Sequence, residues 1–439
     1  MSSTIRSAPT PRVRRVQQTS LALIFLISVL NYIDRGTLSV ANPLIRRDLG
    51  LSIGEMGVLL SAFLWPYAFM LLAAGGIVDR SGPRRVLTVC LVWWSIAQAA
   101  AGFVLSYTQF LIARAMLGIG EAPMFPTAAR VVKDWFHEED QALGVGVWNG
   151  APSLGTAIAP LLLSPVMLAV GWRWMFVLMG IAGFFFAAVW WSVYRDFDNA
   201  QLDSNDRRYL YGTDAPRASS PVRLSGWIRL FKFRSCWGLM LGFFGNIYIS
   251  WLFITWLPGY LELERHMSIL KTGFVAAVPF ICGLFGSVMG GWLADRLTAH
   301  GMPTVASRKL LTIVGLMIMA LATFLAAEAS SNIMAVASIS VAVFFGFWSS
   351  GTSWSLANAL APENYAASLG AIMDFGGFIG GALAPIITGF VVEATGSFIP
   401  ALLVASAIGL LSAVAYLIFV QRSPIPAVAL EVAGSGTQR

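Results

Sequence analysis

Apolar runs of about 20 residues recur along the whole chain, and they constrain its fold more than any other feature. A run of that length crosses the hydrocarbon core of a membrane as one helix. Of the 439 residues, 57% are hydrophobic and only 12% are charged, which is about half the charged fraction of an ordinary soluble domain. The composition therefore excludes a water-soluble enzyme and predicts an all-α membrane protein.

The apolar runs between charged or Gly/Pro-rich breaks predict twelve transmembrane helices. Their predicted limits are 20–43, 56–78, 86–105, 108–132, 142–164, 172–194, 237–261, 269–293, 309–328, 333–357, 365–391 and 397–420. The stretch between the sixth and seventh runs is rich in charge, Ser and Pro. We therefore expect an N-terminal tail (1–19), a six-helix bundle (20–194), a linker (195–236), a second six-helix bundle (237–421) and a C-terminal tail (422–439).

The basic residues predict the orientation of these helices. With a cytoplasmic N-terminus, 22 of the 29 Lys and Arg residues fall on the inner side and five on the outer side. This bias predicts that both termini are cytoplasmic, and it accounts for the net charge of +7 without nucleic-acid binding. The first apolar run is too long for a signal-peptide core and contains Asp34 and Arg35, so we expect it to remain as the first membrane helix.

Cysteine and histidine usage argues against a metal or redox centre. The three cysteines, Cys90, Cys236 and Cys282, lie in or near apolar runs and form no CxxC pattern, while the three histidines fall in predicted loops. We therefore expect no metal site and no cofactor.

The two halves of the chain share short sequence patterns in the same order. Gly75-Gly-Ile-Val-Asp79-Arg80 recurs as Gly291-Trp-Leu-Ala-Asp295-Arg296, and Gly155-Thr-Ala-Ile-Ala-Pro160 recurs as Gly380-Gly-Ala-Leu-Ala-Pro385. Two ordered matches indicate a duplicated six-helix unit, an arrangement typical of transporters.

These motifs carry a family resemblance. The run from Gly75 through Asp79 to Arg85 resembles the signature that the major facilitator superfamily has between its second and third helices. Three more runs resemble the anion:cation symporter family within it: Asn31-Tyr-Ile-Asp34-Arg35, Arg114-xxx-Gly118-xx-Glu121-Ala-Pro123, and Trp172-Arg-Trp-Met-Phe176. Thr255-Trp-Leu-Pro-xx-Leu261 with Met267-Ser-Ile-Leu-Lys-xx-Phe274 is similar to its bacterial sugar-acid members. The resemblance implies a proton-driven organic-anion importer in a bacterial inner membrane, built as two six-helix bundles.

Five ionisable side chains lie well inside the predicted spans: Asp34, Arg35, Arg114, Glu121 and Asp374. A charge at such a position costs about 2.5–3.5 kcal/mol on insertion scales, so each is a candidate functional residue. Arg114 and Glu121 are seven residues apart and share one face of a helix. Structural ion pairs, Asp34 with Arg114 or Arg35 with Glu121, are the alternative interpretation.

The family resemblance implies a role for each of these groups. It implies that Asp34 and Glu121 bind the coupling protons, that Arg35 contacts the anion, and that Arg114 takes part in both. Further candidates for the substrate pocket, with ordinary helix packing as the alternative, are Tyr32, Asn149, Asn246, Tyr248, Trp251, Ser350, Ser353, Trp354 and Asp374.

Two positions depart from the pattern of the sugar-acid permeases. Pro152 stands where they often have a polar amide, and Asp374 where they usually have Asn. The extra carboxylate has three open roles: accepting substrate hydroxyls, pairing with a basic substrate group, or binding another proton. Loss of the amide favours a less hydroxylated or aromatic acid.

Charged and glycine residues at the predicted cytoplasmic ends form a further set. We interpret them either as topological determinants or, as the superfamily resemblance implies, as a gate that links the two halves. They are Gly75, Asp79, Arg80, Gly82, Arg84, Arg85, Asp295 and Arg296.

Several functions remain open at this level. The first is proton-coupled import of an aldonate, aldarate or hexuronate, and the second is import of an aromatic or dicarboxylic acid. The third is an exporter that exchanges drugs or metabolites for protons, and Arg35 and Arg114 argue against it because they repel cationic drugs. A transport-inactive sensor or a membrane enzyme has no supporting motif. We expect a monomer whose partners are a small organic acid, protons and the lipid bilayer, with no nucleic acid.

Overall fold

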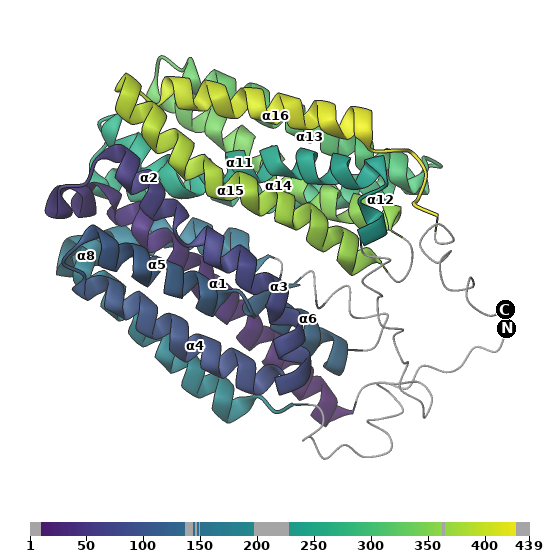
Figure 1. The fold of residues 1–439 in the computed structure, drawn as a ribbon, viewed down its shortest axis with the longest axis horizontal. Helices are drawn as coiled ribbons and strands as arrows, with labels where there is room; N and C mark the ends of the chain where they lie inside the picture. Colours follow the sequence, from purple (N-terminus) through teal and green to yellow (C-terminus); the bar gives the residue numbers. More distant parts are fainter. Residues whose placement is uncertain are drawn as a thin grey trace, which may run out of the picture. The chain divides into compact units, whose positions relative to one another are not determined.

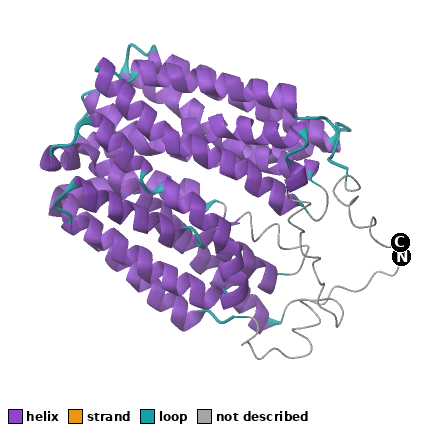
Figure 2. Cartoon of the chain, viewed as in Figure 1, coloured by secondary structure: helices purple, strands orange, loops and turns teal. Residues whose placement is uncertain are grey.

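Helices make up all the regular structure that can be described. The computed structural model describes residues 10–136, 144, 147, 148, 150–196, 228–361 and 365–426, and the structural statements below concern these residues. They contain no strand (Figure 2), so the predicted all-α class is confirmed. The elements labelled in Figure 1 are α1 (Pro11–Leu49), α2 (Ile53–Ser61), α3 (Leu64–Ser81), α4 (Pro83–Ala100), α5 (Tyr107–Glu121), α6 (Met124–Trp135), α8 (Ala151–Val193), α11 (Arg234–Leu263), α12 (Ile269–Ala299), α13 (Thr304–Ala327), α14 (Asn332–Leu360), α15 (Ala366–Thr395) and α16 (Ile399–Phe419); a short 3-10 helix, Ala101–Phe103, follows α4.

The described residues contain ten helical stretches long and apolar enough to cross a membrane, with α2 and α3 counted together as Ile53–Ser81. Many of their large apolar side chains are exposed, for example Leu72, Val288 and Leu411 at 68%, 72% and 68%. Apolar surface on this scale is unfavourable in water and matches acyl chains in a bilayer. The prediction of a multi-spanning membrane protein is therefore confirmed.

Two local features separate these ten stretches from the twelve predicted spans. α8 is 43 residues long, about twice what a bilayer requires, and Gly171 interrupts it with φ 81° and ψ 160°. α5 and α6, with 15 and 12 residues, are each too short to span alone. They are separated at Pro123, whose nitrogen cannot donate a backbone hydrogen bond. The count of twelve stays a prediction.

The chain packs into two compact units. The first comprises Met1–Ala41 and Ala62–Ser219, and the second comprises Asn42–Ser61 and Ser220–Arg439. The change from one unit to the other near residue 220 falls in the expected linker, most of which (197–227) lies outside the described residues. The end of α1 and all of α2 pack with the second unit, although the sequence repeat assigns them to the first six-helix half.

Within the first unit, α4 packs against α5 and α8, and α3 packs against α5 (Figure 1). Gly118 on α5 has no room for a Cβ atom, because the backbone carbonyl of Phe63 occupies that position. The close approach of backbones at a small residue is a usual way to pack membrane helices. It brings α5, which carries Arg114 and Glu121, against the start of α3.

Within the second unit, α11 packs against α15 and α16, and α14 packs against α12 and α13 (Figure 1). α2 packs along α15, where the Glu393 carboxylate accepts hydrogen bonds from the Ser52 hydroxyl at 2.9 Å and from the Gly54 amide. Glu393 thus stabilises the N-terminal end of α2 through groups that the helix itself leaves unbonded.

Candidate functional site

Four ionisable side chains lie together in the first unit. Asp34 and Arg35 come from α1, and Arg114 and Glu121 come from α5. All four are buried, with exposed fractions between 0% and 5%. Their formal charges sum to zero, which is the condition under which four charges can share an apolar interior.

Arg35 and Glu121 form a buried ion pair, in which the Arg35 Nε donates to the Glu121 Oε2 at 2.9 Å. Three aromatic rings surround the same guanidinium, with centroids 4.6 Å (Tyr32), 4.8 Å (Phe63) and 4.8 Å (Tyr67) from its central carbon. Ring faces attract cations, so Arg35 is held by one carboxylate and three rings.

Asp34 and Arg114 are the two members of the cluster without a bonded partner. Both carboxylate oxygens of Asp34 and the Nε and Nη1 atoms of Arg114 are buried and accept or donate no hydrogen bond within the described residues. Asp34 interacts electrostatically with both Arg114 and Glu121, but it forms no hydrogen bond or ion pair with either. Of the two structural pairs considered from the sequence, the Arg35–Glu121 pair forms and the Asp34–Arg114 pair does not.

Three residues near this cluster were given no role from the sequence, although Asn31 was part of a family motif. Phe63 and Tyr67 are one helical turn apart and both face Arg35, while Asn31 lies beside Glu121. The spacing of four residues between Phe63 and Tyr67 indicates that both rings lie on one side of the helix. The sequence does not show that this side faces Arg35 of α1, so it could not assign the rings a role.

The second unit holds most of the other predicted pocket residues. Trp354 is 39% exposed, and Asp374, Ser350 and Ser353 range from half-buried to buried. Tyr248 is fully buried and stacks on Phe244.

Asn246 of α11 is fully buried. In the amide orientation that satisfies both ends, it donates to the Gly346 carbonyl at 3.2 Å and accepts from the Ser350 amide at 3.1 Å. These bonds join α11 to α14, so the side chain has a structural role. Asn149, predicted in the same pocket, lies outside the described residues.

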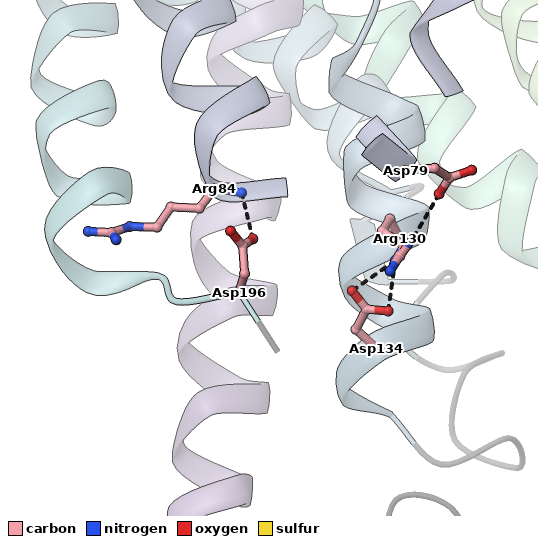
Figure 3. Close-up of polar contacts among 5 residues, drawn as sticks. All are labelled: Asp79, Arg84, Arg130, Asp134 and Asp196. Carbon is pink, nitrogen blue, oxygen red and sulfur yellow. Dashed lines mark hydrogen bonds and ion pairs between the residues drawn. The ribbon is translucent and has the colours of Figure 1, made fainter. Parts of the chain in front are cut away.

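The predicted gating motif lies at the junction of α3 and α4, and Figure 3 shows its polar contacts. Asp79 accepts from Arg130 Nη1 at 2.8 Å, and Arg130 Nε also binds both oxygens of Asp134 at 2.8 and 2.9 Å. From the sequence, Arg130 on α6 was counted only among the basic residues of the inner side, and Asp134 was not considered. Asp79 is therefore joined to α6 of its own unit through Arg130.

The other end of the same turn is held by Asp196. Its Oδ1 accepts from the Arg84 backbone amide at 2.9 Å (Figure 3), and its Oδ2 would lie only 2.9 Å from a Cβ atom on Gly82. Gly82 has φ 76°, a conformation that favours glycine. The Arg84 guanidinium donates to the Trp191 carbonyl at 2.7 Å and lies over the Trp191 ring.

The remaining motif residues make fewer contacts. Gly75, Arg80 and Arg85 are exposed. In the second unit Asp295 pairs with Arg308 at 3.5 Å, and Arg296 lies over the Trp292 ring. The two copies of the motif therefore use their aspartates in ion pairs with different helices.

The site offers no metal-binding set in the part of the chain that the structure describes, since no three His, Cys, Asp or Glu side chains gather there. What the buried cluster offers is a free guanidinium fork beside a free carboxylate. Such a fork fits a planar carboxylate ligand, and the free carboxylate can take up a proton.

Comparison with known proteins gives a consistent family. Residues 24–385 match the profile of the Major Facilitator Superfamily. A probable L-galactonate transporter of Escherichia coli K12 is 39% identical over 414 residues, covering 94% of this chain and 91% of that protein. A D-galactonate transporter of Escherichia coli O6:H1 is 32% identical over 416 residues, covering 92% and 96%.

Solved structures agree on the fold. The crystal structure of a D-xylose-proton symporter matches with a TM-score of 0.73 at 15% sequence identity, covering 93% of this chain and 100% of that one. Ten membrane-spanning stretches and bacterial relatives over almost the full length confirm an integral, multi-pass protein of the bacterial inner membrane. With most of its length matching the family profile, the chain belongs to the major facilitator superfamily.

Proposed function

We propose that this protein imports a sugar acid, such as an aldonate, aldarate or hexuronate, together with protons by alternating access. The observation that carries the proposal is the buried guanidinium of Arg114, whose Nε and Nη1 have no bonded partner. A carboxylate can occupy two donors of one guanidinium at once. The names of the two galactonate transporters support a sugar acid as the cargo.

The carboxylates supply the coupling. In the empty carrier, Glu121 binds Arg35 and the ionised Asp34 offsets the charge of Arg114. Protons from the outside neutralise Asp34 and Glu121, and the two arginines then attract the substrate anion. The three rings around Arg35 keep its guanidinium in place after Glu121 is neutralised. Release of the protons into the cytoplasm restores the Arg35–Glu121 pair and expels the anion.

The full topology belongs to the same proposal: twelve transmembrane helices with both termini in the cytoplasm. The break at Gly171 divides α8 into two spans of ordinary length, and α5 with α6 supplies one span bent at Pro123. The distribution of basic residues supports the orientation.

The charged turn between α3 and α4 acts as part of a cytoplasmic gate in this proposal. Asp79 is 66% exposed at its side chain although it is paired with Arg130, so another group can compete for either partner. The pair is then a switchable contact, since exposed ion pairs are individually weak.

The protein acts as a carrier, without enzymatic activity or a cofactor, as a monomer in the bilayer. A neutral resting cluster of two arginines and two carboxylates requires only protons and the substrate to complete its cycle. An aromatic or dicarboxylic acid is the second candidate cargo, favoured by the 39% exposed Trp354, whose indole offers a stacking face.

The test uses purified protein in liposomes that contain a pH-sensitive dye. Galactonate, glucarate, glucuronate, tartrate, 4-hydroxyphenylacetate and phthalate are added in turn. We expect acidification of the lumen with a sugar acid, loss of this signal in Glu121→Gln, and its retention in Glu328→Gln, which removes an exposed carboxylate. Counterflow exchange should survive in Glu121→Gln. Acidification only by phthalate or 4-hydroxyphenylacetate would favour the second candidate, and silence of the folded wild type across the panel would refute proton symport of these acids.

A further inference from the structure

The Asp374 carboxylate in the second unit has no partner within the part of the chain that the structure describes. Asp374 lies in the third turn of α15 and is half-buried. No hydrogen bond or ion pair joins it to a described residue, and no charged group among them acts on it. It therefore differs from Glu121, which is bonded to Arg35, and from Asp34, which lies among the charges of the cluster.

Asp374 occupies the packed face of α15. Gly370, Gly377 and Gly381 lie one or two turns away on the same face, because their spacing follows the helical period. A Cβ on Gly370 would meet the Trp354 ring at 2.6 Å, and one on Gly377 would meet the Phe243 ring at 2.7 Å. The face carrying Asp374 is thus turned toward α14 and α11.

The aromatic neighbours cover this face only in part. The Phe243 and Trp354 rings pack edge to face with centroids 6.5 Å apart. Trp354 is nevertheless 39% exposed, and the Asp374 carboxylate, on the same side of α15, is only half-buried. The carboxylate is therefore not sealed inside the unit, and the apolar rings beside it supply no compensating charge.

No ionisable group on the described helices that pack against α15 pairs with Asp374. α14 contains no ionisable residue. The ionisable residues of the other elements against α15, and of α15 itself, are Arg234, Cys236, Tyr248, Tyr260 and Glu262 of α11, Tyr416 of α16, Glu55 of α2 and Glu393 of α15. Tyr416 donates to Ser353, and Glu393 and Glu55 both bond at Ser52. None of them acts on Asp374.

We propose that Asp374 is a third proton-binding site of the transport cycle, in addition to Asp34 and Glu121. The inference rests on the proposed function. An ionised, unpaired carboxylate is unfavourable in an apolar interior, and an incoming substrate anion makes it more so. Uptake of a proton by the carboxylate removes both penalties before the loaded carrier reorients. The proton leaves on the cytoplasmic side with those of the first unit, so each substrate enters with one proton more.

The test is the proton-to-substrate stoichiometry, measured from the reversal potential of substrate flux in proteoliposomes with a set potassium-valinomycin voltage. Asp374→Asn should move one proton fewer per substrate, and its accumulation ratio should fall by about 50-fold for each 100 mV of membrane potential. Glu393→Gln removes a carboxylate from the other end of the same helix, and we expect it to keep the wild-type stoichiometry.

The outcomes separate the two proposals. A wild type that moves no sugar acid with protons contradicts the proposed function. A coupled wild type with the same stoichiometry in Asp374→Asn overturns the third site alone, even if the preferred substrate changes.

If Asp374→Asn fails in counterflow exchange, infrared difference spectra on acidification replace the flux measurement. The double variant Asp34→Asn/Glu121→Gln should show a carboxylic-acid band, and this band should disappear when Asp374→Asn is added. A double variant without a band that depends on Asp374 would overturn the inference.

Discussion

Lysine in place of each buried arginine should separate the two roles in the charged cluster. Lysine keeps the positive charge but loses the planar fork of donors. Arg35 donates one hydrogen bond from Nε to Glu121 and lies within three rings, whereas Arg114 Nε and Nη1 have no hydrogen-bond partner within the described residues. Arg35→Lys should therefore destabilise the protein, and Arg114→Lys should weaken substrate binding with little effect on stability.

The contacts set the magnitudes. Loss of one charge-assisted hydrogen bond, with weaker ring contacts, predicts a cost of about 2–4 kcal/mol in the free energy of unfolding for Arg35→Lys. For Arg114→Lys, which weakens only one ring contact, to Phe63 at 5.5 Å, we expect a stability change below about 1 kcal/mol. Loss of one charge-assisted bond to the substrate carboxylate, about 1.5–3 kcal/mol, corresponds to a rise in KM of about 10- to 150-fold.

The assay combines thermal unfolding in detergent micelles, followed by tryptophan fluorescence, with the KM for uptake in proteoliposomes. The two variants serve as matched controls for each other, because they remove the same chemical group from neighbouring positions. Equal destabilisation by both variants would refute the structural role given to Arg35. An unchanged KM in Arg114→Lys would refute the substrate-binding role given to Arg114.

Glycine and gate substitutions give three further predictions. Gly118→Ala should cost about 1–3 kcal/mol in thermal unfolding, because its methyl group meets the fixed carbonyl of Phe63, whereas Gly75→Ala, with open space around it, should stay within about 0.5 kcal/mol. Gly171→Ala should cost about 1–2 kcal/mol in the same assay, since φ is 81° there; no change would contradict the interrupted helix. Arg130→Gln should change stability by less than about 1 kcal/mol because the Asp79 pair is partly exposed, yet lower the maximal transport rate; an unchanged rate would remove Arg130 from the gate.

The fold was largely predictable because membrane burial imposes a simple rule on sequence. Runs of apolar residues must form helices whose backbone bonds are satisfied internally, so the class and most spans follow from composition. The breaks were harder to predict. Pro123 ends hydrogen bonding between α5 and α6, but Pro160 and Pro165 lie inside α8 without ending it. Proline alone therefore does not locate a break, because a membrane helix can continue past a proline when other groups satisfy the freed backbone atoms.

The site was predictable by residue type but not by pairing. Asp34, Arg35, Arg114 and Glu121 stand out because charges are rare in apolar spans. Which arginine pairs with which carboxylate depends on the rotation and separation of α1 and α5, and sequence spacing within one helix does not give either of them. In the gate, charged residues are common rather than rare. Many basic residues lie on the inner side, so nothing in the sequence distinguished Arg130 from its neighbours as the partner of Asp79.

Charge balance links the pairing to transport. In the empty state the cluster of the first unit is neutral, with two arginines and two ionised carboxylates. Protonation of both Asp34 and Glu121, as in the proposed cycle, leaves the cluster neutral with a dianionic substrate and at one positive charge with a monoanionic one. Asp374 adds one negative charge to the empty carrier and none when protonated. With a dianion, the loaded carrier therefore crosses as a neutral species. The empty carrier returns with a net negative charge, so the membrane potential, negative inside, should accelerate the return step rather than the loaded one. A voltage-dependent return that becomes voltage-independent in Asp374→Asn is the kinetic counterpart of the lost proton.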